Sequence, residues 1–191
     1  MAIEFKISRD PHLLQQYYQL REECFREELG IPDFDGSEEE RDKNSLKFLA
    51  IENGKCIGGA RISSELIFQS QIKRLEIEKS SCCMWERFAF HPSMRKLPLM
   101  REFCVRLNEV SWQAGFHNAV ILSPLPNARL YRLGHSTMGV EFNIHRRVPH
   151  CAQSPFAGID HYFSTVSLRD LNPISTDTAI AHKNLLEQRD H

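Results

Sequence analysis

Seven short segments of the chain have the hydrophobic pattern of β-strands. Alternation of apolar and polar residues, as at Ile3, Phe5 and Ile7, is typical of a strand with one buried face. The predicted strands are residues 3–8, 47–52, 56–63, 82–90, 119–122, 138–145 and 161–168. Asn53-Gly54 favours a tight hairpin turn between the second and third strands. Residues 64–79 have a weaker pattern, and Ile72, Leu75 and Ile77 suggest extended chain there.

Apolar residues three or four positions apart predict three helices between these strands. The first begins after Asp10, a good N-cap residue, and ends at Gly30. The second spans 98–115, and a short third helix spans 127–133 and ends at Gly134. The acidic segment 31–44 has few apolar residues, so we expect a surface loop with room for one helical turn.

The order of these elements predicts the fold class. The hairpin gives antiparallel pairing, whereas a strand–helix–strand unit in the middle of the chain implies a right-handed parallel crossover. We therefore expect an α/β (mixed α+β) architecture, a twisted mixed sheet flanked by helices. Residues 1–168 would form a single domain, and residues 169–191 a polar tail that is either one marginal helix or partly disordered.

Composition narrows the functional classes. The net charge of −1 argues against a nucleic-acid partner, and no apolar run approaches the ~20 residues of a membrane span. No signal peptide is visible at the start of the sequence. The six cysteines form no CxxC pair, and the nine histidines form no HExxH motif, so no metal site is expected. These features predict a cytoplasmic protein with reduced cysteines.

The stretch from Trp85 to Arg95 is the strongest candidate for a functional element. Phe88 and Phe90 alternate with polar or small residues until His91-Pro92 ends the strand. A helical pattern resumes near Pro98. A strand that leads into a helix through a short loop can hold an anionic cofactor, because the helix N-terminus presents N–H groups that have no partner within the helix.

Several stretches are similar to motifs of the GNAT superfamily of N-acyltransferases. Residues 20–32 resemble its helix motif R-x-x-V-F-x-x-E-x-G-I-P, and residues 57–62 resemble v-G-x-a-R-l. Residues 86–95 resemble R-v-a-V-x-P-x-x-R, and residues 139–142 with 148–150 resemble the closing G-x-x-F…I-P-H. The resemblance covers about residues 3–168. It implies the GNAT fold and transfer of an acyl group, most simply acetyl, from acyl-CoA to an amine of a small molecule or peptide.

The resemblance also implies roles for individual residues. The implied catalytic residues are Glu86 as the base and Tyr131 as the acid. The implied acyl-CoA contacts are Phe88, Ala89, Phe90, Arg95, Lys96, Leu97, Leu99, Met100 and Asn127. The implied acceptor contacts are Arg21, Phe25, Asp42 and Arg61. Structural alternatives stay open: an ion pair of Glu86 with Arg87 or another surface charge, a packed Tyr131, a helix cap at Asn127, and an ion-pair network of Arg21, Asp42 and Arg61.

The expected cofactor loop departs from the family pattern R/Q-x-x-G-x-G/A. Pro98 and Met100 occupy the two glycine positions, and proline removes an N–H donor. Weaker CoA binding is therefore one alternative, and an autoinducer-synthase-like acyltransferase that uses an acyl-carrier protein or long-chain acyl-CoA is another. Acyl-homoserine-lactone synthases share the fold, and Arg21, Phe25, Asp42, Arg61, Arg87 and Phe88 fit their pattern. Their tryptophan between positions 30 and 42 and their Glu-x-Ser-Arg motif are absent.

A third alternative is a catalytically degenerate GNAT protein that acts as a binding module. The sequence specifies neither the acceptor amine nor the acyl-chain length, and it leaves open whether the chain forms a homodimer.

Overall fold

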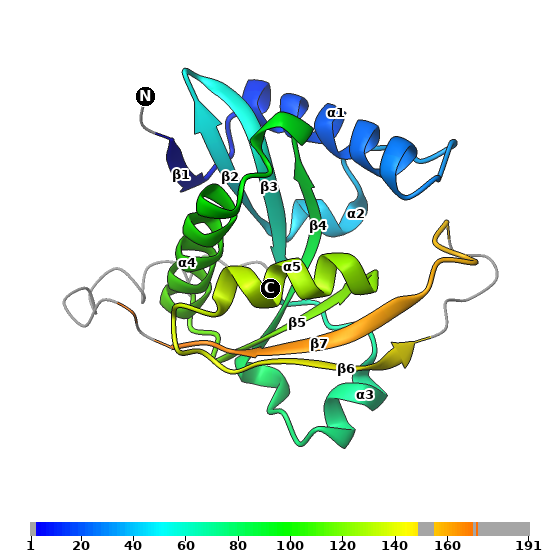
Figure 1. Ribbon diagram of the computed structural model, residues 1–191, viewed down its shortest axis with the longest axis vertical. Coiled ribbons are helices and arrows are strands. Elements are labelled where there is room, and N and C mark those ends of the chain that lie inside the picture. Colours follow the sequence, from blue (N-terminus) through cyan, green and yellow to red (C-terminus); the bar gives the residue numbers. More distant parts are fainter. Residues whose placement is uncertain (1–2, 149–154, 170, 172–191) are drawn as a thin grey trace.

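A computed structural model describes residues 3–148, 155–169 and 171. Within these residues, seven strands form one sheet in the order β1-β2-β3-β4-β5-β7-β6 (Figure 1). Only β4 and β5 pair in parallel; every other neighbouring pair is antiparallel. The predicted mixed sheet is thus confirmed. The strands are Glu4–Ile7 (β1), Leu46–Glu52 (β2), Lys55–Ser63 (β3), Cys82–Phe90 (β4), Asn118–Ser123 (β5), Phe142–Val148 (β6) and His161–Ser167 (β7).

Helices cover both faces of the sheet (Figure 1). Side chains of α1 (Pro11–Glu28) pack with Leu49 and Ile51 on one face. Side chains of α4 (Leu97–Gln113) and α5 (Leu125–His135) pack with Phe48 and Trp85 on the other. A smaller cluster joins α3 (Gln69–Arg74) to β4, β5 and β7. Short helical turns lie at Glu40–Lys43 (α2), Lys79–Ser81 and Pro92–Met94.

Three local predictions need correction. Residues 69–74 are helical rather than extended, because Ile72 is fully buried against Met84 on that short helix. Helix α5 continues through Gly134, which lies so close to α4 that an added Cβ would be 2.7 Å from Cys104 Sγ. Strand β6 begins at Phe142 rather than at residue 138, since Gly139 adopts a left-handed φ of 63° in the preceding turn.

Strands β4 and β5 separate before either of them ends. Their ladder runs from Cys82–Asn118 to Trp85–Ile121, although β4 continues to Phe90 and β5 to Ser123. At the point of separation, Arg87 has a left-handed φ of 56°, and the β3–β4 register shifts opposite it. The buried Tyr17 hydroxyl of α1 donates to the Arg87 carbonyl at 2.7 Å, which holds this β-bulge in place.

Two further observations concern only the described residues. No described helix is long and apolar enough to cross a membrane. Within the same ranges, no three His, Cys, Asp or Glu side chains are grouped so that they could hold a metal ion. Apart from Arg169 and Leu171, the predicted tail 169–191 lies outside the described residues, as do Pro149 and His150 of the closing motif.

Candidate functional site

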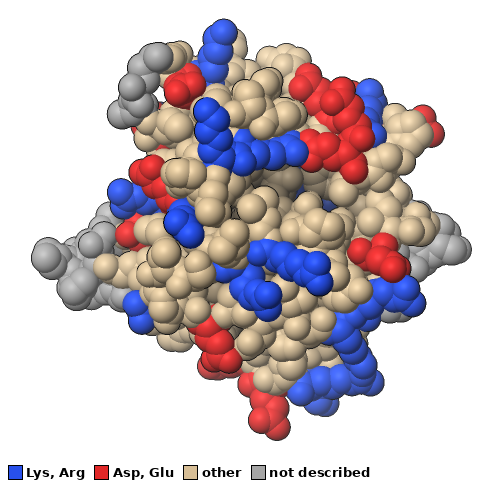
Figure 2. Space-filling model, viewed as in Figure 1, with Lys and Arg blue, Asp and Glu red and all other residues tan. Residues whose placement is uncertain are grey.

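A cavity of about 500 Å³ lies where β4 and β5 have separated. Its walls come from β4, from the ends of β5 and α1, from the starts of α4 and α5, and from Arg41, Arg95 and residues 67, 68, 155, 156 and 161. Figure 2 shows the face that carries α5 hollowed near its centre, with basic side chains on both sides of the hollow. The volume is within the usual range for a small-molecule site. Beyond Trp85, the β5-facing edge of β4 has no β5 partner, so its backbone groups can pair with a ligand.

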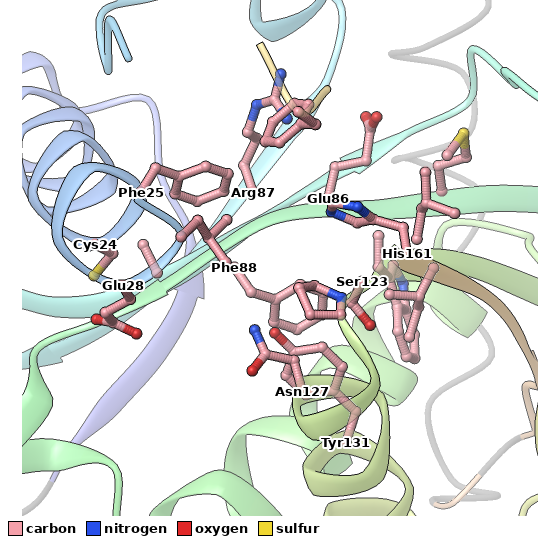
Figure 3. A pocket seen from close by; sticks show the side chains of 18 of the residues that line it. Cys24, Phe25, Glu28, Glu86, Arg87, Phe88, Ser123, Asn127, Tyr131 and His161 are labelled. Carbon is pink, nitrogen blue, oxygen red and sulfur yellow. The ribbon is translucent and has the colours of Figure 1, made fainter. Parts of the chain in front are cut away.

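Tyr131 and Asn127 enter the cavity wall from α5 (Figure 3). The Tyr131 ring stacks on Phe88 with a centroid separation of 4.5 Å, so α5 is packed directly on the bulged part of β4. Burial raises the pKa of Tyr131 above its usual range, so the hydroxyl keeps its proton at neutral pH. Asn127 is the third residue of α5 and not its N-cap, which is Pro124.

Glu86 lies in the cavity wall but is held by two arginines. Its carboxylate accepts hydrogen bonds from Arg41 Nη1 at 2.6 Å and from Arg61 Nε at 3.1 Å. Of the partners suggested for Glu86, Arg87 is wrong, because Arg87 pairs with Glu39 at 2.7 Å, and other charged side chains pair with Glu86 instead. Burial favours the neutral form of Glu39, but Arg87 and Arg61 outweigh it and lower the Glu39 pKa to about 2.

Arg21, Asp42 and Arg61 lie behind the cavity wall rather than in it. All three side chains are fully buried. Asp42 accepts from Arg21 Nη1 at 3.0 Å and from Arg61 Nη1 at 3.1 Å. This arrangement favours the ion-pair network over direct contact with an acceptor. Among the four residues predicted to contact the acceptor, Phe25 is the one that lines the cavity, where it stacks on Phe34.

The predicted cofactor loop is partly engaged in contacts within the protein. Arg95 donates to the Phe90 carbonyl oxygen at 2.9 Å through Nε and forms an ion pair with Glu28 of α1. Lys96 is the N-cap of α4, and Pro98 is its second residue. Because proline has no N–H, the first turn of α4 offers fewer donors to an anion than a glycine loop would. Ala89, Phe90, Arg95 and Met100 line the cavity, whereas Lys96, Leu97 and Leu99 do not.

Arg41, Ser123 and His161 are among the wall residues that the sequence did not identify. Arg41 comes from α2, Ser123 from the end of β5, and His161 from the start of β7. No local pattern distinguishes them, because only the folded sheet brings their segments to one cavity. Ser123 Oγ is buried and has no hydrogen-bond partner within the described part of the chain.

Comparison with solved structures identifies the architecture. The Salmonella typhimurium protein yncA, solved with its cofactor acetyl-CoA, aligns over 92% of this chain and 99% of its own length, with 17% identity and a TM-score of 0.64. A ribosomal-protein-alanine N-acetyltransferase from Brucella melitensis aligns over 86% of this chain and 99% of its own, with 14% identity and a TM-score of 0.64. The chain has the GNAT fold.

A third structure extends the comparison within the GNAT fold. The CoA-dependent acyl-homoserine lactone synthase BjaI, solved with SAM and isopentyl-CoA, aligns over 98% of this chain and 88% of its own, with 16% identity and a TM-score of 0.61. No protein-family model and no curated protein matches the sequence. The likeness is therefore one of fold, and the chemistry of the site has to be argued from its own residues.

Proposed function

We propose that this GNAT-fold protein is an N-acyltransferase that moves an acyl group from acyl-CoA to the amine of a small molecule or peptide. The observation that carries the proposal is the opening between β4 and β5, with its cavity of about 500 Å³. An elongated donor that carries amide groups fits there, since backbone groups of Phe88, Ala89 and Phe90 lie along an edge without a β5 partner.

The side chains around this opening suit acyl transfer. The reaction needs a donor that polarises the thioester carbonyl, an acid that protonates the leaving thiolate, and a base that takes a proton from the amine. Backbone N–H groups at the β4 bulge are the candidate donors for the carbonyl oxygen. Tyr131 is the candidate acid, because it is protonated at neutral pH and its ring is fixed against Phe88. Asn127 would contact the CoA arm from the same helix.

Two observations favour a carrier protein as the second candidate for the acyl donor. Pro98 removes one N–H from the first turn of α4, and Arg95 is already paired with Glu28. Both features leave the protein with fewer N–H donors and positive charges that can bind the diphosphate of CoA. A carrier protein presents the same pantetheine arm without that diphosphate. All five described cysteines are unpaired, which supports the proposed cytoplasmic location.

Calorimetric titration distinguishes these possibilities. We expect acetyl-CoA or a longer acyl-CoA to bind with a micromolar Kd and to release thiol when amino acids, polyamines or short peptides are added. Tighter binding of an acylated carrier protein than of any acyl-CoA would favour the second candidate. If none of the three donors bound, both enzyme proposals would be rejected, and a binding module without acyltransferase activity would remain.

A further inference from the structure

The β-bulge in β4 turns two neighbouring side chains of opposite charge to the same side of the strand. Consecutive residues of a regular strand point to opposite faces of the sheet. Arg87, however, has a left-handed φ of 56°, and Figure 3 shows Glu86 and Arg87 on one side of β4 with Tyr131 on the other. Both charged residues line the cavity. The bulge therefore presents a carboxylate and a guanidinium to the same part of its wall.

The Arg87 guanidinium is fixed by contacts within the protein. Its Nε and Nη2 donate to Glu39 Oε1 at 3.0 and 2.7 Å. Its Cζ lies 5.8, 5.7 and 5.2 Å from the ring centroids of Phe25, Phe34 and Phe156, distances at which a cation is attracted to an aromatic ring. A side chain that is already fixed loses little conformational entropy when it binds a ligand.

One nitrogen of Arg87 remains available to a ligand. No residue of the described ranges accepts a hydrogen bond from Arg87 Nη1, and 19% of the side chain is exposed. The cavity wall contains two other arginines, Arg41 and Arg95, and each of their guanidinium nitrogens donates to an acceptor of the protein. Guanidinium N–H groups bind an anionic oxygen most strongly, so Arg87 is the wall residue best suited to a carboxylate.

Glu86 provides the opposite charge on the same side of β4. Its Oε1 accepts a hydrogen bond from Arg41 Nη1, and its Oε2 accepts one from Arg61 Nε. An ionised carboxylate has room for about four hydrogen bonds, so each oxygen can accept another from an ammonium group. The Glu86 side chain is 10% exposed and lines the cavity, so a ligand in the cavity can reach it.

The ion pairs around these two residues contain both charges in equal number. Within the described residues, one connected network joins four arginines to four carboxylates: Arg21, Arg41, Arg61 and Arg87 with Glu39, Asp42, Glu65 and Glu86. A purely cationic or purely anionic ligand would add a charge without its counter-charge, which is unfavourable in a buried site. A zwitterion adds one charge of each sign and keeps the balance.

We propose that Glu86 binds the ammonium group and Arg87 the carboxylate of an α-amino acid, and that this amino acid is the acyl acceptor. The inference rests on the proposed function and specifies its acceptor. Both charged groups of an α-amino acid are attached to one carbon atom, which suits binding groups on adjacent residues of one strand. The amino acid would approach β4 from the side opposite Tyr131, the candidate acid for the leaving thiolate. A longer peptide, in which the terminal amine lies far from the carboxylate, fits less well.

Matched acceptors test this assignment on the wild-type protein. Each standard amino acid is offered as the free acid, as its C-terminal amide and as the amine that lacks the carboxyl group, together with whichever of the three acyl donors binds most tightly, and thiol release is measured. For the best acceptor, kcat/KM of the acid should exceed that of the amide and of the amine at least about tenfold, mainly through KM, because hydrogen bonds between charged groups are strong. A tripeptide with the same first residue should behave like the amide.

Arg87→Gln removes the positive charge but keeps a side chain that can donate to Glu39. We expect the ratio of kcat/KM between acid and amide to fall below about threefold. Because this ratio compares two substrates of one protein, a loss of folded protein cancels from it. Glu86→Gln should instead raise KM for acid and amide alike, since both carry the ammonium group. The matched control is Arg106→Gln, because Arg106 also pairs with a glutamate, Glu109, but does not line the cavity; its ratio should stay within about twofold of the wild type.

Two results would overturn the inference alone. One is a wild-type protein that acylates amines but uses acids and amides equally well, and this result needs no variant to fold. The other is an Arg87→Gln protein that keeps the full preference for acids. If the wild type acylates none of the acids, amides, amines and peptides, the proposed function and the inference fail together.

Discussion

At the scale of single residues, His135 is the buried group that links pH to the packing of Tyr131. It is 1% exposed, and its ring stacks on Trp85 with a centroid separation of 5.5 Å. Its Nδ1 lies 2.7 Å from the Tyr131 carbonyl oxygen, and Nε2 has no hydrogen-bond partner among the described residues. Burial lowers the pKa of His135 to about 4, so a proton added to this ring opposes the folded state.

The His135 environment predicts an acid-labile fold. An unfolded histidine titrates near 6.5 and the folded one near 4, so between these values the unfolded state binds the proton first. The unfolding free energy should therefore fall as pH falls from 6.5 to 4, by about 3 kcal/mol in total from this residue. His135→Phe keeps the ring packing and should flatten that slope in urea titrations at several pH values. Identical slopes for both proteins would contradict the prediction.

The sequence predicted some of the residues that line the cavity but not others, and the difference has a physical reason. Glu86, Phe88 and Tyr131 lie on single elements whose order along the chain is recognisable, and the cavity includes all three. Whether Arg21 or Asp42 faces a ligand or an internal partner depends on the packing of α1 against the sheet, which sequence spacing does not encode. His161 likewise gains its position from a strand that inserts between β5 and β6.

At the scale of elements, a strong hydrophobic periodicity was sufficient to predict a helix or strand, whereas a weak one was not. The strands β1 to β5 and the helices α1 and α4 match the predictions within a few residues, because each buries a regular apolar face. Helix α3 buries a single residue, Ile72, so no periodic pattern predicts it. The predicted end of α5 was wrong because Gly134 looks like a helix stop but instead allows close contact with Cys104 of α4.

At the same scale, the missing N–H in the first turn of α4 leads to a prediction about CoA binding. Pro98→Ala adds an N–H at the second helical position, where it can donate to a phosphate oxygen. A hydrogen bond to a charged group is worth at least about 1 kcal/mol, so acetyl-CoA should bind roughly fivefold more tightly. S-acetylpantetheine, which lacks the diphosphate, should bind equally well to both proteins.

Helix α5 supplies the matched control, since Pro126, like Pro98, is the second residue of its helix and lies outside the cavity lining, but it does not belong to the predicted cofactor loop. Pro126→Ala should leave the Kd for acetyl-CoA unchanged. Equal affinity of Pro98→Ala and the wild type for acetyl-CoA would show that the diphosphate does not contact this turn.

At the scale of the whole molecule, one ion-pair network connects the elements that shape the cavity. Arg21 of α1 and Arg61 of β3 share Asp42 of α2, and Arg61 also binds Glu86 of β4. Glu39 extends the network to Arg87 at the β4 bulge. Helix α1 and the strands around the opening are thus joined by buried charges, which are costly unless every one of them has its partner.

Asp42→Asn tests whether this network is structural or contacts the acceptor. Removal of one buried carboxylate leaves two guanidinium groups without their shared counter-charge, so the unfolding free energy should fall by about 3–5 kcal/mol in urea titrations. Glu40→Gln, on the same short helix but exposed and in an ion pair with Lys43, should cost less than about 0.5 kcal/mol. If the role is structural, the Asp42→Asn protein should keep the wild-type KM for the acceptor when it is assayed at a low temperature at which it stays folded. A KM raised tenfold, with little loss of stability, would instead place Asp42 in contact with the substrate.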